Sequence, residues 1–226
     1  MDKEQIQSAI AKAKDTSPKR NFKQSFDLII NLKGLDLKKP EHQVDTFVTL
    51  PYLRGKKIKV CALVGAELAE QAKNVCDFTV LSDDFERYKD KKEIKKLANS
   101  CDFFIAQVNI MPKVATAFGR IFGPRGKMPN PKAGCVVPPN ANLKQLYEKL
   151  QKTVRLSAKI APLVQCSIGS EDMDINEIAE NGLAIYNSLL HVLPNEKHNV
   201  KDAYIKLTMG KPIKMGEKIE VTKEAK

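Results

Sequence analysis

The stretch IKVCALVG, residues 58–65, decides the fold because it is an apolar run that ends in glycine. Such a run is typical of a β-strand buried on both faces, as in parallel sheets. Short strands and helices are then expected to alternate, with strands at 78–81 and 101–106 and helices at 66–74, 91–100, 112–122 and 143–153. This alternation predicts a parallel sheet with helices on both faces.

The segments on either side show a different pattern. In SFDLIINLKG, residues 25–34, apolar and polar side chains alternate, which predicts a half-buried antiparallel strand. DTFVTLP, residues 45–51, is expected to be its partner. Further elements are expected as helices at 3–14 and 174–194 and as half-buried strands at 153–159, 163–169 and 203–210.

The change of pattern predicts two domains and an α/β fold class. We expect an outer α+β domain, residues 1–57 plus 153–226, whose antiparallel sheet is formed by both chain ends. A Rossmann-like α/β domain, residues 58–152, is expected to be inserted into it. The two connections would lie side by side and act as a hinge.

The charge of the chain points to a polyanionic partner. Lys and Arg total 38 against 27 acidic residues, which gives a formal net charge of +11. This is typical of proteins that bind nucleic acid or phosphate surfaces, although a soluble basic protein without such a partner stays an alternative. No stretch is long and apolar enough to span a membrane, and the N-terminus lacks the apolar core of a signal peptide. We therefore expect a cytoplasmic protein without membrane contact.

Motifs for catalysis or metal binding are not found. The cysteines are odd in number, lack zinc-site spacing and are interpreted as small buried hydrophobic residues: Cys61, Cys76, Cys101, Cys135 and Cys166. The glycine-rich loop near residue 126 does not match a phosphate-binding P-loop, because Ile121 takes the place of a glycine and Met128 that of Ser or Thr. We expect no enzyme, no cofactor and no metal, with an enzyme that uses nucleotide phosphates as a weaker alternative.

The loop GPRGKMPNPKAG, residues 123–134, combines glycine, proline and three cations. Proline restricts φ and glycine allows close backbone approach, so the loop can present Arg125, Lys127 and Lys132 in one preformed arrangement. Such a loop can clamp a phosphate backbone. It can equally be a rigid crossover whose cations face water, and the residues alone leave both interpretations open.

Two motifs resemble a known family. IFGPRGKMPNPKAG, residues 121–134, closely resembles the signature of the ribosomal protein L one family, the stalk protein of the large subunit. YIKLTMGKP, residues 204–212, resembles the second, RNA-facing signature of that family. The similarity runs from RNFKQSFDLIINLKGLDLKKPE, residues 20–41, to Lys211, and is greatest to the archaeal branch, as TVRL at 153–156 and IGSEDM at 168–173 indicate.

The resemblance implies a structural protein of the large ribosomal subunit. Its outer domain would bind the stalk region of large-subunit rRNA, while the inserted domain would lie near the exit site and assist release of tRNA. Binding of its own mRNA as a translational repressor is also implied, as is a monomer outside the ribosome. A generic polyanion-binding protein is the alternative.

The resemblance also implies which residues contact RNA. By position, they are Phe22, Arg155, Lys159, Thr208, Met209 and Gly210. A threonine hydroxyl can bond a ribose, methionine and phenylalanine can pack on apolar parts of the RNA, glycine allows close approach to the minor groove, and cations neutralise phosphates. Taken alone, Phe22 is more simply interpreted as a core residue, Thr208 and Met209 as the end of a strand, and Arg155 and Lys159 as ordinary surface cations.

Two further expectations follow from the resemblance. Asp202 stands where the family usually has a small hydroxyl residue facing the RNA, so we expect weaker binding at that point unless Asp202 accepts a bond from a ribose or from Lys201. The cations of the 123–134 loop, Arg125, Lys127 and Lys132, would face the elbow of the exit-site tRNA or brace the region beside the hinge.

Overall fold

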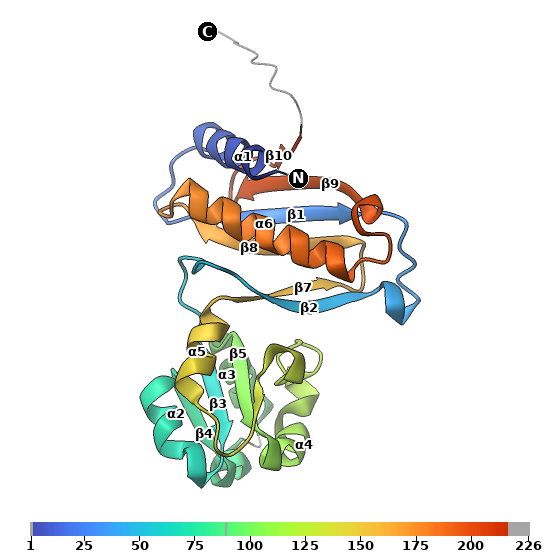
Figure 1. The fold of residues 1–226 in the computed structure, drawn as a ribbon. Helices are drawn as coiled ribbons and strands as arrows, with labels where there is room; N and C mark the ends of the chain where they lie inside the picture. The colour runs from blue at the N-terminus through green and yellow to red at the C-terminus, as the bar shows by residue number, and fades with distance from the viewer. Residues whose placement is uncertain (1, 89, 217–226) are drawn as a thin grey trace. The chain divides into compact units, whose positions relative to one another are not determined.

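The structure is a computed structural model that describes residues 2–88 and 90–216 (Figure 1). It divides into two compact units. One joins the N-terminal segment, up to Lys56, to the C-terminal segment from Val154, and is called the end unit here. The other spans Lys57–Thr153 and is called the inserted unit. That each unit folds independently as a domain stays a prediction.

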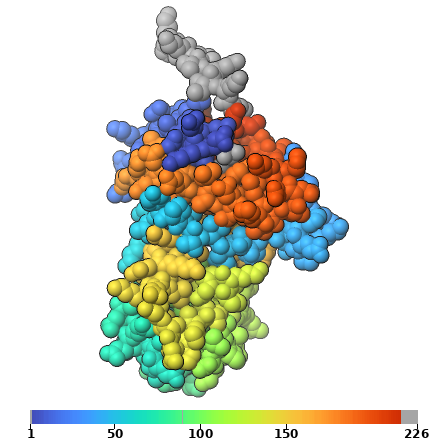
Figure 2. All heavy atoms as spheres, in the orientation of Figure 1, coloured from blue at the N-terminus to red at the C-terminus, as the bar shows by residue number. Residues whose placement is uncertain are grey.

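The end unit is built on a four-stranded antiparallel sheet of order β10-β9-β1-β8. Its strands are β1 (Ser25–Leu32), β8 (Leu163–Ser170), β9 (Val200–Leu207) and β10 (Ile213–Lys214). Helices α1 (Lys3–Thr16) and α6 (Ile175–Val192) pack against one another and against this sheet. Figure 2 shows the N-terminal helix, in blue, among C-terminal residues in orange and red.

One core holds the end unit together. The alternating residues of β1, namely Phe26, Leu28, Ile30 and Leu32, are buried together with Ile6 and Ile10 of α1 and Ile178, Ile185 and Leu189 of α6. Burial of each such side chain contributes about 1.5–3 kcal/mol relative to its exposure. The predicted half-buried strand, the long helix and the antiparallel sheet formed by both chain ends are therefore confirmed.

The expected partner of the first strand was wrong. Segment β2 (Val44–Thr49) pairs with β7 (Thr153–Ala158) in a separate two-stranded sheet, while both edges of β1 are taken by β8 and β9. Consecutive strands that pair as a hairpin are usually joined by a turn of two to five residues. Residues 33–43 instead form a longer loop that contains a 3-10 turn at Pro40–His42, so β2 is not held next to β1 and pairs with β7.

The inserted unit contains a parallel sheet of order β4-β3-β5-β6, as predicted from the alternating pattern. Its strands are β3 (Val60–Val64), β4 (Phe78–Leu81), β5 (Phe103–Gln107) and β6 (Val136–Val137), and its helices are α2 (Ala69–Val75), α3 (Lys91–Ser100), α4 (Met111–Phe122) and α5 (Leu143–Gln151). Every residue of β3 is buried. Cys61 and Leu63 face the core formed with α3 and α4, so Val60, Ala62 and Val64 face the opposite side.

Some details were not expected from the sequence. The two-residue strands β6 and β10 were missed, since so short a segment has no periodicity to detect. Four of the five cysteines are buried as expected, whereas Cys76 is partly exposed. Within residues 2–88 and 90–216, no helix is long and apolar enough to span a membrane, and no three His, Cys, Asp or Glu side chains are grouped so as to hold a metal ion.

Candidate nucleic-acid interface

The segment Thr208–Gly210 directly follows β9 and lies beside the start of β1. The Thr208 hydroxyl accepts a hydrogen bond from the backbone N–H of Ser25 at 3.1 Å and lies 3.3 Å from the Ser25 carbonyl oxygen, to which it can donate. The backbone N–H of Thr208 also donates to that carbonyl at 3.1 Å. Thr208 therefore joins the end of one strand to the beginning of its neighbour.

Met209 is held by a buried side chain. Its backbone N–H donates to Oε1 of Gln24 at 3.1 Å, and Gln24 is only 2% exposed. The carbonyl oxygen of Gln24 in turn accepts a bond from the N–H of Glu171 at 2.9 Å. Because its amide oxygen is engaged in the protein interior, Gln24 fixes the backbone of Met209 while the methionine side chain remains outside.

Gly210 is required for space. A Cβ atom at this position would lie 2.3 Å from Oγ of Ser17 and 3.2 Å from Cβ of Leu207. Real Cβ atoms do not approach a neighbour so closely, so a larger residue here would require the Ser17 side chain to rotate and Leu207 to shift slightly. The proximity of Ser17 gives this glycine an internal reason, in addition to the close approach of RNA that the resemblance implies.

Two large hydrophobic side chains are exposed at this end of the sheet. Phe22 is 52% exposed and Met209 is 57% exposed, so Phe22 is not a core residue. Phe22 lies two residues before Gln24, which holds Met209. We call Phe22, Thr208, Met209 and Gly210 the sheet-end cluster. Phe22 and Met209 are its exposed apolar side chains, and hydrogen bonds hold the backbone of Thr208, Met209 and Gly210 in place.

Arg155 and Lys159 lie elsewhere, on or next to β7 of the two-stranded sheet. Arg155 binds both carboxylate oxygens of Asp45, at 2.9 and 3.3 Å, and its guanidinium carbon lies 5.9 Å from the centre of the Phe47 ring. Lys159 Nζ lies 2.6 Å from the same carboxylate. The structure thus places these two cations with Asp45 and not in the sheet-end cluster.

The charge of Asp45 is stabilised by this arrangement. Burial raises the pKa of its carboxyl, but the hydrogen bonds from Arg155 and Lys159 act in the opposite direction and outweigh burial, so the pKa falls below its usual value. The three side chains together carry one net positive charge. Arg155 and Lys159 would therefore have to share Asp45 with any phosphate that they bind.

Asp202 has a partner other than the expected one. Lys214 of β10 lies 3.1 Å from its carboxylate, whereas Lys201, the suggested donor, points away as an exposed neighbour on the same strand. The ion pair fastens the short strand β10 to β9. Any RNA near this position would meet a carboxylate whose charge Lys214 already offsets in part.

The sheet face opposite the core adds residues that the sequence did not indicate. Between β8, β1 and β9 it forms a shallow groove of about 340 Å³ lined by the outward-facing Asp27, Ile29, Gln165, Ser167 and Lys206, with the core residue Cys166 reaching its edge. Burial raises the pKa of the Asp27 carboxyl, and nearby Lys206 and the Ser25 hydroxyl only partly offset that effect. Period-two alternation marks such residues as outward-facing, but only pairing of the strands brings them together.

In the inserted unit, the 123–134 loop is fastened to the C-terminal end of α3. Lys127 Nζ donates to the carbonyl oxygen of Ala98 at 2.7 Å and to that of Cys101, and Arg125 donates to the side-chain oxygen of Asn99. The last carbonyls of a helix lack partners within the helix and carry partial negative charge, so cations are favourable there. These two cations therefore serve the fold of the unit.

The rest of the loop is also ordered by internal bonds. Asn130 accepts a bond from the N–H of Lys132 at 2.9 Å, while the side chain of Lys132 is exposed. Gly126 and Gly134 have φ of 64° and 74°, which explains why glycine stands at both positions. The three cations of the loop thus do not form one cluster, since Arg125 and Lys127 bind α3 and Lys132 does not.

Comparisons with known proteins agree with the resemblance seen in the sequence. The model of the Ribosomal protein L1p/L10e family matches residues 11–211. "Large ribosomal subunit protein uL1" of Methanothermococcus thermolithotrophicus is 45% identical over 94% of this chain and 98% of its own length. The proteins of the same name from Methanothermobacter thermautotrophicus and Methanocaldococcus jannaschii are 41% and 39% identical, covering 94% and 95% of this chain and 99% and 96% of their own lengths. The chain therefore belongs to the Ribosomal protein L1p/L10e family.

Proposed function

We propose that this chain is a structural protein of the large ribosomal subunit whose end unit binds the stalk region of large-subunit rRNA. Membership of the family and the names of the relatives support the ribosomal role. The family consists of ribosomal proteins and not of enzymes. The site of action is accordingly the ribosome in the cytoplasm.

The sheet-end cluster is the observation that carries the RNA contact. Phe22 and Met209 are more than half exposed although both are large and apolar, and Gln24 and Ser25 hold the segment Thr208–Met209 in place. A preorganised apolar surface loses little entropy when it packs on riboses or bases. Lys206 and the polar side chains of the open sheet face continue this surface and can bind phosphates and 2′-hydroxyls.

A second candidate function concerns the inserted unit and regulation. We propose that it lies near the exit site, where Lys132, an exposed cation of the 123–134 loop without a bond to α3, would contact departing tRNA. The same sheet-end cluster would bind the protein's own mRNA if that message contains a fold similar to the stalk RNA. Both extensions rest on the family resemblance and on the net charge of +11.

A competition experiment tests the proposal. A labelled fragment of the large-subunit stalk RNA is bound to the full chain at about physiological salt and challenged with excess scrambled RNA of equal length. Retention of the labelled fragment supports a specific RNA site. Free displacement by the scrambled RNA would contradict it, because counterion release alone gives salt-dependent binding without preference among RNAs.

A further inference from the structure

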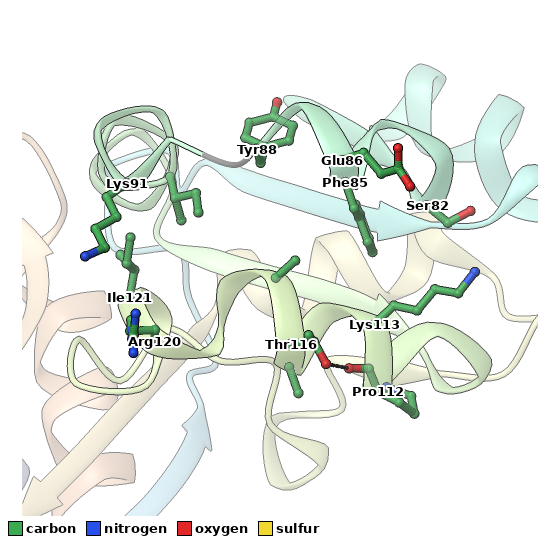
Figure 3. A pocket seen from close by; sticks show the side chains of 13 residues that line it. Ser82, Phe85, Glu86, Tyr88, Lys91, Pro112, Lys113, Thr116, Arg120 and Ile121 are labelled. Carbon is green, nitrogen blue, oxygen red and sulfur yellow. Dashed lines mark hydrogen bonds between the residues drawn. The ribbon is translucent and has the colours of Figure 1, made fainter.

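The inserted unit has a groove that the RNA interface does not use. It lies between α4 on one side and α3 with the 3-10 turn Ser82–Arg87 on the other (Figure 3). Its volume is about 990 Å³, which is at the upper end of the range for ligand pockets. Because the groove is open to solvent along the helices and not enclosed, it suits an extended or helical segment better than a small molecule.

The floor of the groove is apolar and rigid. Phe85, Ile94 and Ile121 line it and are each less than a tenth exposed. The Phe85 ring packs edge-on against Phe118 at 5.2 Å, and the Tyr88 ring lies 5.6 Å from the same phenylalanine. Because these rings are already packed on the core of the unit, the floor exists before any partner binds.

The rim of the groove is positively charged. Lys91, Lys113 and Arg120 line it, and Glu86 is the one acidic side chain among the lining residues. Within the described part of the chain, none of the three cations forms an ion pair. Lys113 and Arg120 are two turns apart on α4, about 10 Å at the helical rise per residue. Figure 3 shows Arg120 and Lys91 at one end of the groove and Lys113 at the other.

We propose that this groove docks an acidic, amphipathic helical segment of a protein partner. Recognition of a helix in a groove uses apolar anchors at intervals of three and four residues, which would pack on Phe85, Ile94 and Ile121. The acidic residues on the flanks of the segment would meet Lys91, Lys113 and Arg120. This charge complementarity steers association and excludes basic segments.

The groove favours a protein segment over RNA. RNA-binding surfaces present aromatic faces for base stacking, but Phe85 is only 7% exposed and its ring is engaged by Phe118. The site lies in the inserted unit and is independent of the sheet-end cluster, so it adds a partner to the proposed function and does not depend on it.

The test uses the full chain and a labelled synthetic peptide with leucine or phenylalanine at helical spacing and glutamate elsewhere. A peptide of the same composition in scrambled order is the control ligand. The groove variant is Lys113→Glu with Arg120→Glu, and the matched control is Lys92→Glu with Lys96→Glu, since these exposed lysines of α3 do not line the groove. Fluorescence anisotropy measures the affinity of the wild type and of each variant for each of the two peptides.

We expect the amphipathic peptide to bind, with affinity reduced at least about tenfold in the groove variant and less than about twofold in the control variant. Absence of binding, equal binding of the scrambled peptide or equal losses in both variants would overturn the proposal. The proposal would also be overturned if an RNA displaced the peptide and the binding of that RNA itself depended on Lys113 and Arg120. Stalk RNA affinity, measured with the same groove variant, is expected to stay unchanged and so separates this test from that of the RNA interface.

Discussion

Lys127 Nζ lies 2.7 Å from the carbonyl oxygen of Ala98, so the signature loop of the inserted unit is bonded to the last turn of α3. The same ammonium group also donates to the carbonyl of Cys101. A basic residue that the sequence suggested as a phosphate contact thus satisfies carbonyl groups that the helix leaves without partners.

Replacing Lys127 by methionine should destabilise the inserted unit. The change retains much of the apolar stem but leaves two carbonyl groups without their charged donor, at a cost of roughly 1–3 kcal/mol. Thermal or denaturant unfolding measures the loss, and Lys132→Met is the matched control because its side chain is exposed. Equal stability of the two variants would show that the bonds to α3 contribute nothing.

Replacing Arg125, Lys127 and Lys132 together by alanine should leave the affinity for isolated stalk RNA nearly unchanged. These residues belong to the inserted unit, whereas the proposed RNA contacts belong to the end unit. The binding constant is measured at a temperature where the variant is folded, as judged by circular dichroism. A large loss of affinity would show that the loop is part of the primary RNA site.

Thr208→Val should weaken stalk RNA binding at least about tenfold. The variant loses the hydroxyl that is proposed to bond the RNA, and it also loses the bond to Ser25 that holds this hydroxyl in position. In the free protein this hydroxyl orders the start of β1 through Ser25. Thr49→Val, on an exposed threonine at the end of β2, is the control. If both variants bind RNA as the wild type does, the sheet-end cluster is not the contact surface.

Asp202→Ser should strengthen RNA binding a few-fold. The change removes a negative charge near the proposed RNA surface and releases Lys214 from its ion pair at 3.1 Å. Asp84→Ser is a close control, because Asp84 also loses an ion pair of 3.1 Å, with Arg87, but lies in the inserted unit. Unchanged or weaker affinity of the Asp202 variant would contradict the expectation.

Asp45→Asn should lower stability at neutral pH by roughly 1 kcal/mol, because Arg155 and Lys159 lose a shared charged acceptor. The pKa of Asp45 is lowered in the folded protein, so its contribution is fully present above the pKa of the unfolded chain and is lost as the pH falls through the folded value. The stability difference from wild type should therefore shrink as the pH falls below the usual pKa of an aspartate, 3.8.

Unfolding curves at several pH values measure the stability difference that Asp45→Asn introduces. Asp172→Asn is the control, since its pair with Lys23 is largely exposed and should contribute little. A difference that stays constant from neutral to acidic pH would contradict the assigned role of Asp45.

Local patterns were enough to predict most secondary structure. The alternation in β1, the apolar run of β3 and the stripe on α6 each reflect burial of neighbouring residues, which the sequence records directly. The pairing of β2 with β7 was not predictable, because it depends on which strand edges remain open once β8 and β9 flank β1.

The candidate site was predictable only in part. The exposure of Met209 agrees with its assignment to an RNA-facing signature, but its support by Gln24 joins residues 185 positions apart and has no sequence signal. Arg155, Lys159 and Lys127 were recognised as cations, yet their acceptors come from other elements. Charge can be counted in a sequence, whereas the groups that neutralise it are known only after folding.

The central claim is that RNA binds the end unit through the sheet-end cluster, and hydrogen exchange of the full chain with and without the stalk RNA fragment tests it most directly. We predict added protection at the start of β1 and at Lys206–Gly210, with no change in the 123–134 loop. Protection confined to the inserted unit, or spread evenly over the basic surface, would contradict the account.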